Sequence, residues 1–322
     1  MLLAAPARLP QRIAIFVVPK FSLMDFTAVI EAGRIANRMS GRELYSWHVL
    51  SKDGRPVAAS SGIAMNAEAP LSEATRYDLL IVSAGMEGHL YDDREVFAQL
   101  RRIARRGMDI GAMNLGSYLL ARSGLLDGYR CTVHWQNLPG LIEAFPRLDV
   151  TSTLFEIDRD RFTCSGGIAA LDMMLQFISA QHGAALAKSV AEHFIHERIR
   201  DKHDSQRMPL SIRLGVRHPS LLDAIRFMEG NLEEPANRQQ LARVAKVSTR
   251  QLERLFRRHL ARTPSQFYLE LRLDKARHLL QQTAMGVLEV AVACGFASPS
   301  HFSKCYRQRF QKTPSAERFP PG

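Results

Sequence analysis

A corner between a strand and a helix, within residues 108–124, has the form that enzymes use to present a nucleophile. The apolar run MDIGAMN leads into the helical stretch GSYLLARSG. Such a corner raises one side chain beside a helix N-terminus, where the dipole and the backbone amides stabilise the negative charge of a reacting Ser or Cys. Asp25 follows the first apolar run of the chain, and His134 lies in the stretch CTVHW. An acid and a base of these types are the other groups that such a site requires.

A second pattern with chemical potential lies in the last third of the chain, where a basic helix follows a tight turn. Arg238–Ala245 is a short helical stretch, Lys246-Val247 supplies a turn, and Ser248 is a natural N-cap for a helix over Thr249–His259. One face of that helix is apolar at i, i+3 and i+4 spacing, with Leu252, Leu255 and Phe256. The other face is polar and mostly basic, with Arg250, Gln251, Glu253, Arg254, Arg257 and Arg258. This layout is typical of a helix-turn-helix unit.

The same layout returns about fifty residues later in the chain. Val287–Cys294 is a short helical stretch, Gly295 supplies the turn, and Ser298 caps a helix over Pro299–Arg309, with proline at its first position. The residues expected to face outward are Ser300, His301, Ser303, Lys304 and Arg307. The residues between the two units, Pro264–Gln281, are long enough to form a rigid connecting helix.

The charge of the chain is concentrated in this region. The formal net charge is +11, and residues 217–322 carry 18 Lys and Arg against 9 Asp and Glu, whereas residues 1–216 carry 25 against 23. Such asymmetry favours a polyanionic partner for the last third alone. Charge by itself does not separate this interpretation from a merely basic surface.

Short strands alternate with helices in the first part of the chain, over residues 12–200. Strands are predicted at RIAIFVV, LYSWHVLS, YDLLIVSAG and MDIGAMN, and helices at Asp25–Met39, Glu95–Arg106, GSYLLARSG, Gly167–His182 and Ala184–Arg200. This alternation predicts a mostly parallel sheet covered on both faces. The polar stretch that follows carries two prolines and a glycine and is interpreted as a linker. The expected organisation is a domain over 1–200, a linker over 201–217 and an all-helical domain over 218–320.

The last hundred residues resemble the AraC/XylS family of bacterial regulators. The resemblance rests on LARVAKVSTRQLERLFRRHLARTPSQFYLELRLDKARHLL and on VLEVAVACGFASPSHFSKCYRQRFQKTPSAER. It implies a two-headed monomeric binder whose recognition helices enter successive major grooves on one face of double-stranded DNA. Matching positions place Arg250, Glu253 and Arg254, and in the second unit Ser300, Ser303 and Lys304, near base edges, with Arg257 and Arg307 at phosphates. Glu253 would either accept from cytosine or orient Arg254, and some of these charges could simply form a solvated helix face.

Residues 12–200 resemble the DJ-1/PfpI branch of the class I glutamine amidotransferase-like superfamily, which has a flavodoxin-like parallel sheet. The resemblance rests on YDLLIVSAG, on LLARSGLLDGYRCTVHW after the elbow, and on TCSGGIAALDMMLQFI. In catalytic members the elbow residue is Cys, and this position is Asn114; the acid falls on Asp25 and the base on His134. An amide has no ionisable thiol or hydroxyl, so the domain is predicted not to be an enzyme. A hydrolase or amidase is the alternative, disfavoured by Asn114.

The two domains together resemble the GlxA-like regulators, and the first of them is expected to bind a small effector. Residues 21–62 look like regulators that control catabolism of arginine, glycine betaine and carnitine, which implies an amine, a quaternary ammonium compound or an amino acid. Carboxylates and aromatic rings suit a cationic ligand, and the candidate ligand-binding residues are Asp25, Glu31, Asn114, His134 and Trp135. The residue types fit a plainer account equally well, in which Phe21 and Trp47 are core and Glu31 pairs with Arg34.

The expected function is therefore that of a metabolite-responsive transcriptional activator of a catabolic operon. RNA polymerase and a second copy of the chain, joined through the first domain, are the further expected partners. Cytoplasmic location is expected because no apolar window is long enough for a membrane span. No cofactor or metal is expected, because Cys131, Cys164, Cys294 and Cys305 form no CxxC pair and should be free buried thiols. A constitutive DNA-binding protein with an empty pocket is a further alternative.

Overall fold

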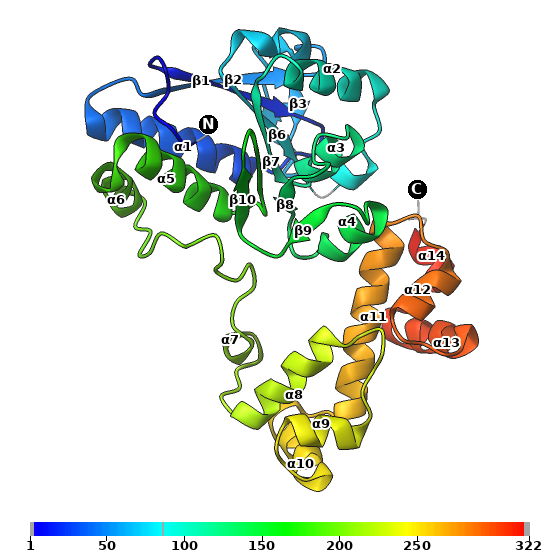
Figure 1. Cartoon of the computed structure of the whole chain (residues 1–322). Helices are drawn as coiled ribbons and strands as arrows, with labels where there is room; N and C mark the ends of the chain where they lie inside the picture. Colours follow the sequence, from blue (N-terminus) through cyan, green and yellow to red (C-terminus); the bar gives the residue numbers. More distant parts are fainter. Residues whose placement is uncertain (1–2, 86, 319–322) are drawn as a thin grey trace. The chain divides into compact units, whose positions relative to one another are not determined.

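The computed structural model describes residues 3–85 and 87–318, and the chain divides into two compact units, 1–206 and 207–322 (Figure 1). Within the described residues, the first unit contains a seven-stranded sheet in the order β10-β11-β7-β6-β1-β2-β5. All neighbouring strands in it are parallel except β10 and β11. The strands are β1 (Gln11–Val17), β2 (Tyr45–Ser51), β5 (Ala69–Pro70), β6 (Leu79–Ala84), β7 (Asp109–Asn114), β10 (Phe155–Asp158) and β11 (Arg161–Cys164).

Helices cover both faces of this sheet, as buried parallel strands require. One core contains residues of α1 (Leu23–Ser40), α5 (Ala169–His182) and α6 (Ala184–His193). The core on the opposite face contains residues of α2 (Arg94–Ala104), α3 (Gly116–Arg122) and α4 (Leu138–Ala144). Figure 1 shows α1, α5 and α6 on one side of the strands and α2 and α3 on the other. The α/β expectation for the first domain is confirmed.

Smaller elements of this unit lie where the sequence pattern predicted only connections. They are β3 (Val57–Ala58), β4 (Ala64–Met65), β8 (Arg130–Thr132), β9 (Asp149–Thr151), and the 3-10 helices η1 (Leu71–Arg76) and η2 (Gly88–Leu90). The strands among them have only two or three residues, too few to show a hydrophobic period, and a 3-10 helix does not follow the 3.6-residue period of an α-helix.

The helix expected over Ala184–Arg200 is too long by seven residues, because α6 ends at His193. The N–H of His196 bonds to the carbonyl of Ala191 at 3.0 Å, and Ile195 has φ of 55°, in the left-handed region. This pair of features closes the helix. An isoleucine is a poor residue for that conformation, and for this reason the sequence gives no stop signal here.

The second unit is helical throughout its described residues, as expected. It contains α7 (Leu210–Leu214), α8 (Pro219–Gly230), α9 (Arg238–Val244), α10 (Thr249–Leu260), α11 (Pro264–Gln282), α12 (Val287–Ala293), α13 (Pro299–Phe310) and α14 (Pro314–Arg318). Helix α11 contributes Phe267 and Tyr268 to the core around α8–α10, and Leu273 and Ala276 to the core around α12 and α13. The predicted connecting helix therefore packs against both helix-turn-helix units.

The residues expected to form a linker, 201–217, are divided between the two units. The carbonyl of Lys202 accepts from the N–H of Leu154 at 2.8 Å, within the first unit. Helix α7 belongs to the second unit, where Arg213 donates to Glu229 at 2.8 Å. The chain changes unit between Gln206 and Arg207.

Candidate nucleic-acid interface and effector site

Helices α10 and α13 are built to one plan, displaced by 50 residues along the chain. Ser248 and Ser298 occupy the N-caps and accept from the backbone N–H three residues on, at 3.2 and 3.4 Å. The C-caps, Ala261 and Gln311, both have left-handed φ angles, 55° and 57°. Because side chains at i, i+3, i+4 and i+7 share one helix face, the eight predicted DNA contacts form two matching rows. The rows are Arg250, Glu253, Arg254 and Arg257, and Ser300, Ser303, Lys304 and Arg307.

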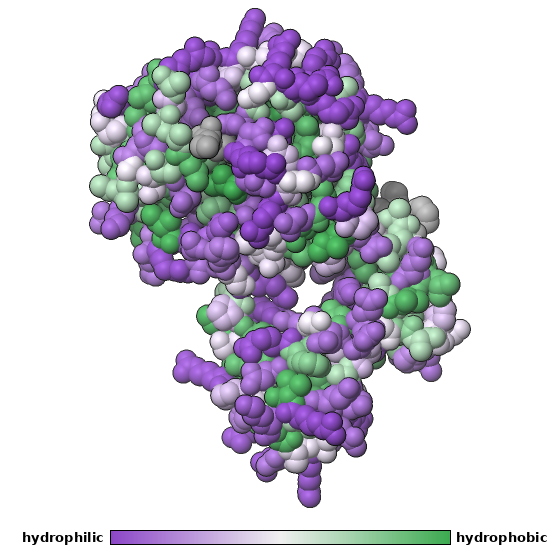
Figure 2. Space-filling view, viewed as in Figure 1, coloured by the Kyte–Doolittle hydropathy of each residue, from purple (hydrophilic) through white to green (hydrophobic). Residues whose placement is uncertain are grey.

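The row on α10 presents exposed guanidinium groups. Arg250, Arg254 and Arg257 are exposed, and among the described residues none of them has a hydrogen-bond or ion-pair partner. In the view of Figure 2, the surface around α10 is predominantly hydrophilic. Glu253 differs, because its carboxylate accepts from Arg238 of α9 at 3.1 Å. Glu253 thus pairs with Arg238, and neither of the two roles considered for it from the sequence included this partner.

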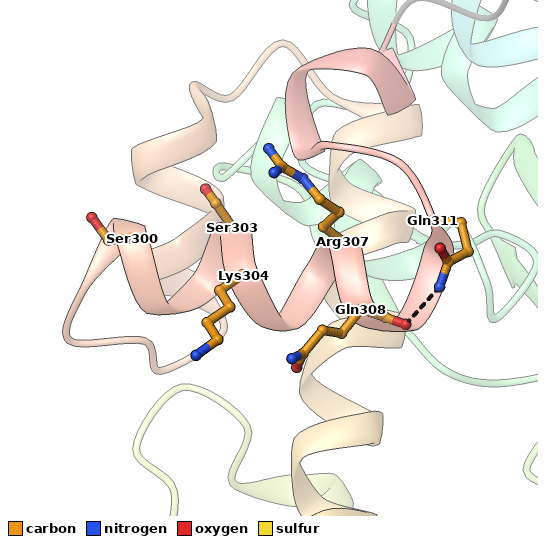
Figure 3. A pocket seen from close by; sticks show the side chains of 6 residues that line it. All are labelled: Ser300, Ser303, Lys304, Arg307, Gln308 and Gln311. Atoms are coloured by element: carbon orange, nitrogen blue, oxygen red, sulfur yellow. Dashed lines mark hydrogen bonds between the residues drawn. The ribbon is translucent and has the colours of Figure 1, made fainter.

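The row on α13 lines a hollow of about 550 Å³ whose walls are all polar residues of this helix and its C-cap. Figure 3 shows Ser300, Ser303 and Arg307 along one edge of the helix, with Lys304 and Gln308 projecting from the other edge. Lys304 and Arg307 are exposed, and neither has a partner within the described part of the chain. A basic hollow on the outer face of a capped helix suits an anionic, hydrogen-bonding surface.

The cations that do have partners lie elsewhere in the same unit. Arg309, two residues from Arg307, donates to both carboxylate oxygens of Asp274 on α11, at 2.8 and 2.9 Å. Arg262 pairs with Glu270 of α11 at 2.6 Å. Ion pairs therefore connect α11 to its neighbours and leave the cations of the two outer rows, on α10 and α13, without carboxylate partners among the described residues.

The second helix-turn-helix unit is fixed to α11 at the carboxyl end of α12. Arg272 donates to the carbonyls of Cys294 and Gly295, at 2.7 and 2.6 Å, and Lys275 donates to the carbonyl of Ala293 at 2.8 Å. Cations at a helix C-terminus satisfy its free carbonyls and its dipole. A Cβ on Gly295 would approach the carbonyl of Glu233 to 2.6 Å, so the turn lies against the loop before α9. The second helix-turn-helix unit thus contacts both α11 and the loop before α9.

In the first unit, Asn114 occupies the strained corner predicted from the sequence. It is the last residue of β7 and has φ of 55°, in the left-handed region that Asn tolerates better than most residues. A Cβ on Gly166, whose φ is 92°, would lie 2.9 Å from the Cβ of Asn114. A glycine is needed there both for this close approach and for the backbone angle.

Asp25 lies beneath this corner and is fully buried. Its carboxylate accepts from the side-chain amide of Asn114 at 3.2 Å and from the backbone N–H of Gly167. Burial raises the pKa of Asp25, and the hydrogen bonds from Gly167, Asn114 and Ser22 oppose that rise. Since the amide nitrogen of Asn114 faces the carboxylate, its carbonyl oxygen remains as an acceptor, and no described residue donates to it.

The other candidate ligand residues, His134, Trp135 and Glu31, have different surroundings. The ring of His134 lies beside that of Trp135, tilted by 38° with 5.6 Å between ring centroids, and burial lowers the pKa of His134. Glu31 lies on the outer face of α1 and pairs with Arg34 at 2.6 Å. Phe21 is buried in the core and Trp47 packs against it, an arrangement that matches the plainer account of these residues.

The comparisons with known proteins agree on both halves of the chain. The DJ-1/PfpI family profile matches residues 11–180, and a helix-turn-helix domain profile matches residues 241–318. The chain is 48% identical over 311 residues to the HTH-type transcriptional regulator GbdR of Pseudomonas aeruginosa, covering 97% of this chain and 85% of that protein. The chain belongs to the AraC-type transcriptional regulators that carry a DJ-1/PfpI domain.

Two further relatives match this AraC-type regulator over different shares of its length. The HTH-type transcriptional regulator GlxA of Rhizobium meliloti is 38% identical over 319 residues, which cover 99% of this chain and 98% of that protein. The crystal structure of an AraC family transcriptional regulator from Pseudomonas putida matches with a TM-score of 0.53 and 28% identity, over 57% of this chain and 100% of that chain. The chain is thus a DNA-binding regulator and not an enzyme.

Some contacts of the AraC-type regulator were not predicted from its sequence, and other features concern the expectations about cysteines, metals and membranes. Arg238 and the pair Gly166-Gly167 contact predicted site residues but were not predicted themselves; the consecutive glycines before α5 were the available signal. All four cysteines are free and buried, as expected. Over residues 3–85 and 87–318, no group of three or more His, Cys, Asp or Glu side chains could hold a metal ion. No described helix is both long and apolar enough to cross a membrane.

Proposed function

We propose that α10 and α13 read the operator, one in each of two successive major grooves. Arg250 and Arg254 contact base edges, where a guanidinium can bind guanine through two hydrogen bonds. Ser300, Ser303 and Lys304 take the equivalent places in the second groove. Arg257 and Arg307 bind phosphates, which fix the register of the protein on the duplex without reading sequence.

The observation that carries this proposal is the match between the two rows of polar and cationic side chains, in which all members but Glu253 lack a partner among the described residues. Each row occupies the same positions of its helix, 50 residues apart, and both helices are fixed on α11. The pair of Arg238 and Glu253 adds a positioned cation beside the first row. A rigid mount holds the spacing between the two heads constant, as binding on one face of a duplex requires.

Binding of the full chain to the DNA upstream of its own gene tests the proposal. Affinity should fall steeply as salt rises, because each neutralised phosphate releases counterions. Arg307→Ala should weaken binding and flatten that salt dependence. The matched control is Arg226→Ala, which removes the same charge from α8, where Arg226 pairs with Asp223 at 2.8 Å. Equal losses in both variants would show that only net charge matters and would reject the assigned interface.

We propose that the first unit binds the effector at the corner formed by Asn114 and Asp25, and that His134 and Trp135 also contact it. The carbonyl of Asn114 and the carboxylate of Asp25 offer negative charge density to an amine, a quaternary ammonium compound or an amino acid. Glu31 is left out because Arg34 already neutralises it. We propose further that the bound form activates a catabolic operon in the cytoplasm, together with RNA polymerase, as a dimer joined through the first unit.

A thermal-shift screen of the full chain tests the effector class. Glycine betaine, carnitine and arginine are the first probes, and a compound that binds only the folded state raises the midpoint. Asn114→Ala should abolish the shift, and Glu73→Gln, on the distant helix η1, should retain it. If no amine or amino acid shifts the midpoint, the effector class is wrong; if Asn114→Ala keeps the full shift, the location is wrong.

A further inference from the structure

A buried carboxylate in the first turn of α5 holds the segment that leads toward the DNA-binding unit. Asp172 is fully buried. It accepts from Nε2 of His196 at 2.8 Å, from the backbone N–H of Arg200 at 2.9 Å and from the guanidinium of Arg200 at 2.8 Å. A buried carboxylate is stable only when donors of this kind surround it. The chain after α6 is therefore fastened to α5 at two points.

The same segment is fastened again before it leaves the first unit. The carbonyl of Lys202 accepts from the backbone of Leu154. The side-chain amide of Gln206 donates to Thr132 Oγ1 and to two carbonyls, of Val133 and Thr153, at 3.2, 3.1 and 2.7 Å. We name residues 196–206 the connecting segment. Its last residue is also the last residue of the first unit.

The groups that hold the connecting segment adjoin the residues of the proposed effector site. The N–H of Gly167 donates to Asp25, and the N–H of Asp172 bonds to the carbonyl of Ile168 at 3.3 Å, so the loop at Gly166-Gly167 continues into the turn that carries Asp172. Ser165, just before the loop, donates through its N–H to the carbonyl of Leu154 at 2.8 Å. Val133, an acceptor for Gln206, directly precedes His134. A shift of the loop or of His134 would therefore reach the connecting segment through short chains of hydrogen bonds.

We propose that Asp172, His196, Arg200 and Gln206 form a clasp that couples effector occupancy to the connecting segment. This inference depends on the proposed effector site, and it states how effector binding there is transmitted to the connecting segment. An effector that moves the Gly166-Gly167 loop changes the position of Asp172 and therefore its hydrogen bonds with Arg200. The connecting segment then has two states, held and released, and an effector with different affinity for the two shifts their populations. The four side chains are positioning residues, which touch neither effector nor DNA.

Variants of Arg200 test the clasp in the full chain. Arg200→Ala should keep the thermal shift by glycine betaine, carnitine or arginine, and the basal affinity for operator DNA. It should lose the change in DNA affinity that the same probe causes in the wild type, and Arg200→Lys should restore part of it. The matched control is Arg198→Ala, two residues away, which removes the same charge and an ion pair with Asp204 at 2.9 Å but no hydrogen bond to Asp172. A full probe response in Arg200→Ala would overturn the clasp and leave the proposed function standing.

A second experiment needs no ligand and remains informative if Arg200→Ala does not fold. Gly166→Ala should displace the loop, because its Cβ would meet Asn114 at 2.9 Å. Gly128→Ala is the control: its φ of 73° imposes similar backbone strain, but no atom lies within 4 Å of the added Cβ. Hydrogen exchange of the full chain should show faster exchange at Leu154 and Arg200 in Gly166→Ala alone. Equal exchange in the two variants overturns the clasp. Selective exchange without a thermal shift from any probe supports the clasp and rejects the effector class.

Discussion

The side-chain amide of Asn114 donates to the carboxylate of Asp25 across 3.2 Å and so joins the end of β7 to the first turn of α1. The resemblance to catalytic DJ-1/PfpI proteins places a cysteine where this amide stands. The corner keeps its strained backbone although the residue at its tip cannot act as a nucleophile. Strain that persists without catalysis is consistent with a retained binding site.

Substitutions of Asn114 should separate the backbone requirement from the side-chain contact. Asn114→Val should lower the free energy of unfolding by about 1–3 kcal/mol, because a β-branched residue is strained in the left-handed region. Asn114→Gly should cost less, since glycine adopts φ of 55° without strain. Both variants lose the hydrogen bond to Asp25. Urea unfolding followed by tryptophan fluorescence measures the difference, because Trp47 and Trp135 both lie in the first unit. Equal destabilisation would show that the hydrogen bond, and not the backbone, dominates.

Arg254 and Arg257 should differ in how they affect sequence preference. Arg254→Ala should weaken binding to the cognate operator by about 1–3 kcal/mol and relax preference at one base pair. Arg257→Ala should weaken binding to all duplexes alike and reduce the salt slope by about one. Titrations of cognate and random duplexes at several salt concentrations distinguish the two effects. If both variants lose the two duplexes equally, the assignment of Arg254 to a base edge fails.

The pair formed by Arg238 and Glu253 should act as one unit in DNA binding. Both side chains are substantially exposed, at 60% and 36%, so the pair should contribute under about 1 kcal/mol to folding stability. In operator affinity, a double-mutant cycle of Arg238→Ala and Glu253→Ala should show coupling of about 0.5 kcal/mol or more. Additive losses would mean that Glu253 does not position Arg238. A gain in affinity from Glu253→Ala would instead show that its carboxylate only repels phosphate.

The sequence predicted elements with a strong period or a specific cap, and missed contacts between distant residues. Ser248, Ser298 and the connecting helix α11 were predicted because caps and helical periodicity are local. The contacts of the clasp were not predicted, because Asp172 and Arg200 are 28 residues apart and residues 194–200 were assigned to the second of two helices. The partner of Glu253 was also missed, since Arg238 lies on another helix. Local patterns therefore supplied the rows of candidate contacts, and tertiary packing decided which charges are paired.

A last prediction concerns acid stability of the first unit, through Asp78 at the start of β6. Burial would raise the pKa of Asp78, but hydrogen bonds from the Arg12 side chain and backbone, and from Arg8, outweigh it and lower that pKa to about 2. An aspartate with a lowered folded pKa stabilises the fold above its unfolded pKa of about 3.9, and this contribution is lost as pH falls toward 2.

Asp78→Asn should therefore lower the free energy of unfolding by roughly 2 kcal/mol near pH 7, and the difference from the wild type should shrink to under about 0.5 kcal/mol near pH 2. Tryptophan fluorescence during urea unfolding across this range reports on the first unit. Asp53→Asn is the control, because Asp53 is 54% exposed, its guanidinium partner Arg55 lies 3.6 Å away, and its one hydrogen bond comes from the backbone N–H of Arg55 at 3.1 Å. A difference between Asp78→Asn and the wild type that stays constant from pH 7 to pH 2 would show that shape, and not charge, explains the contribution of Asp78.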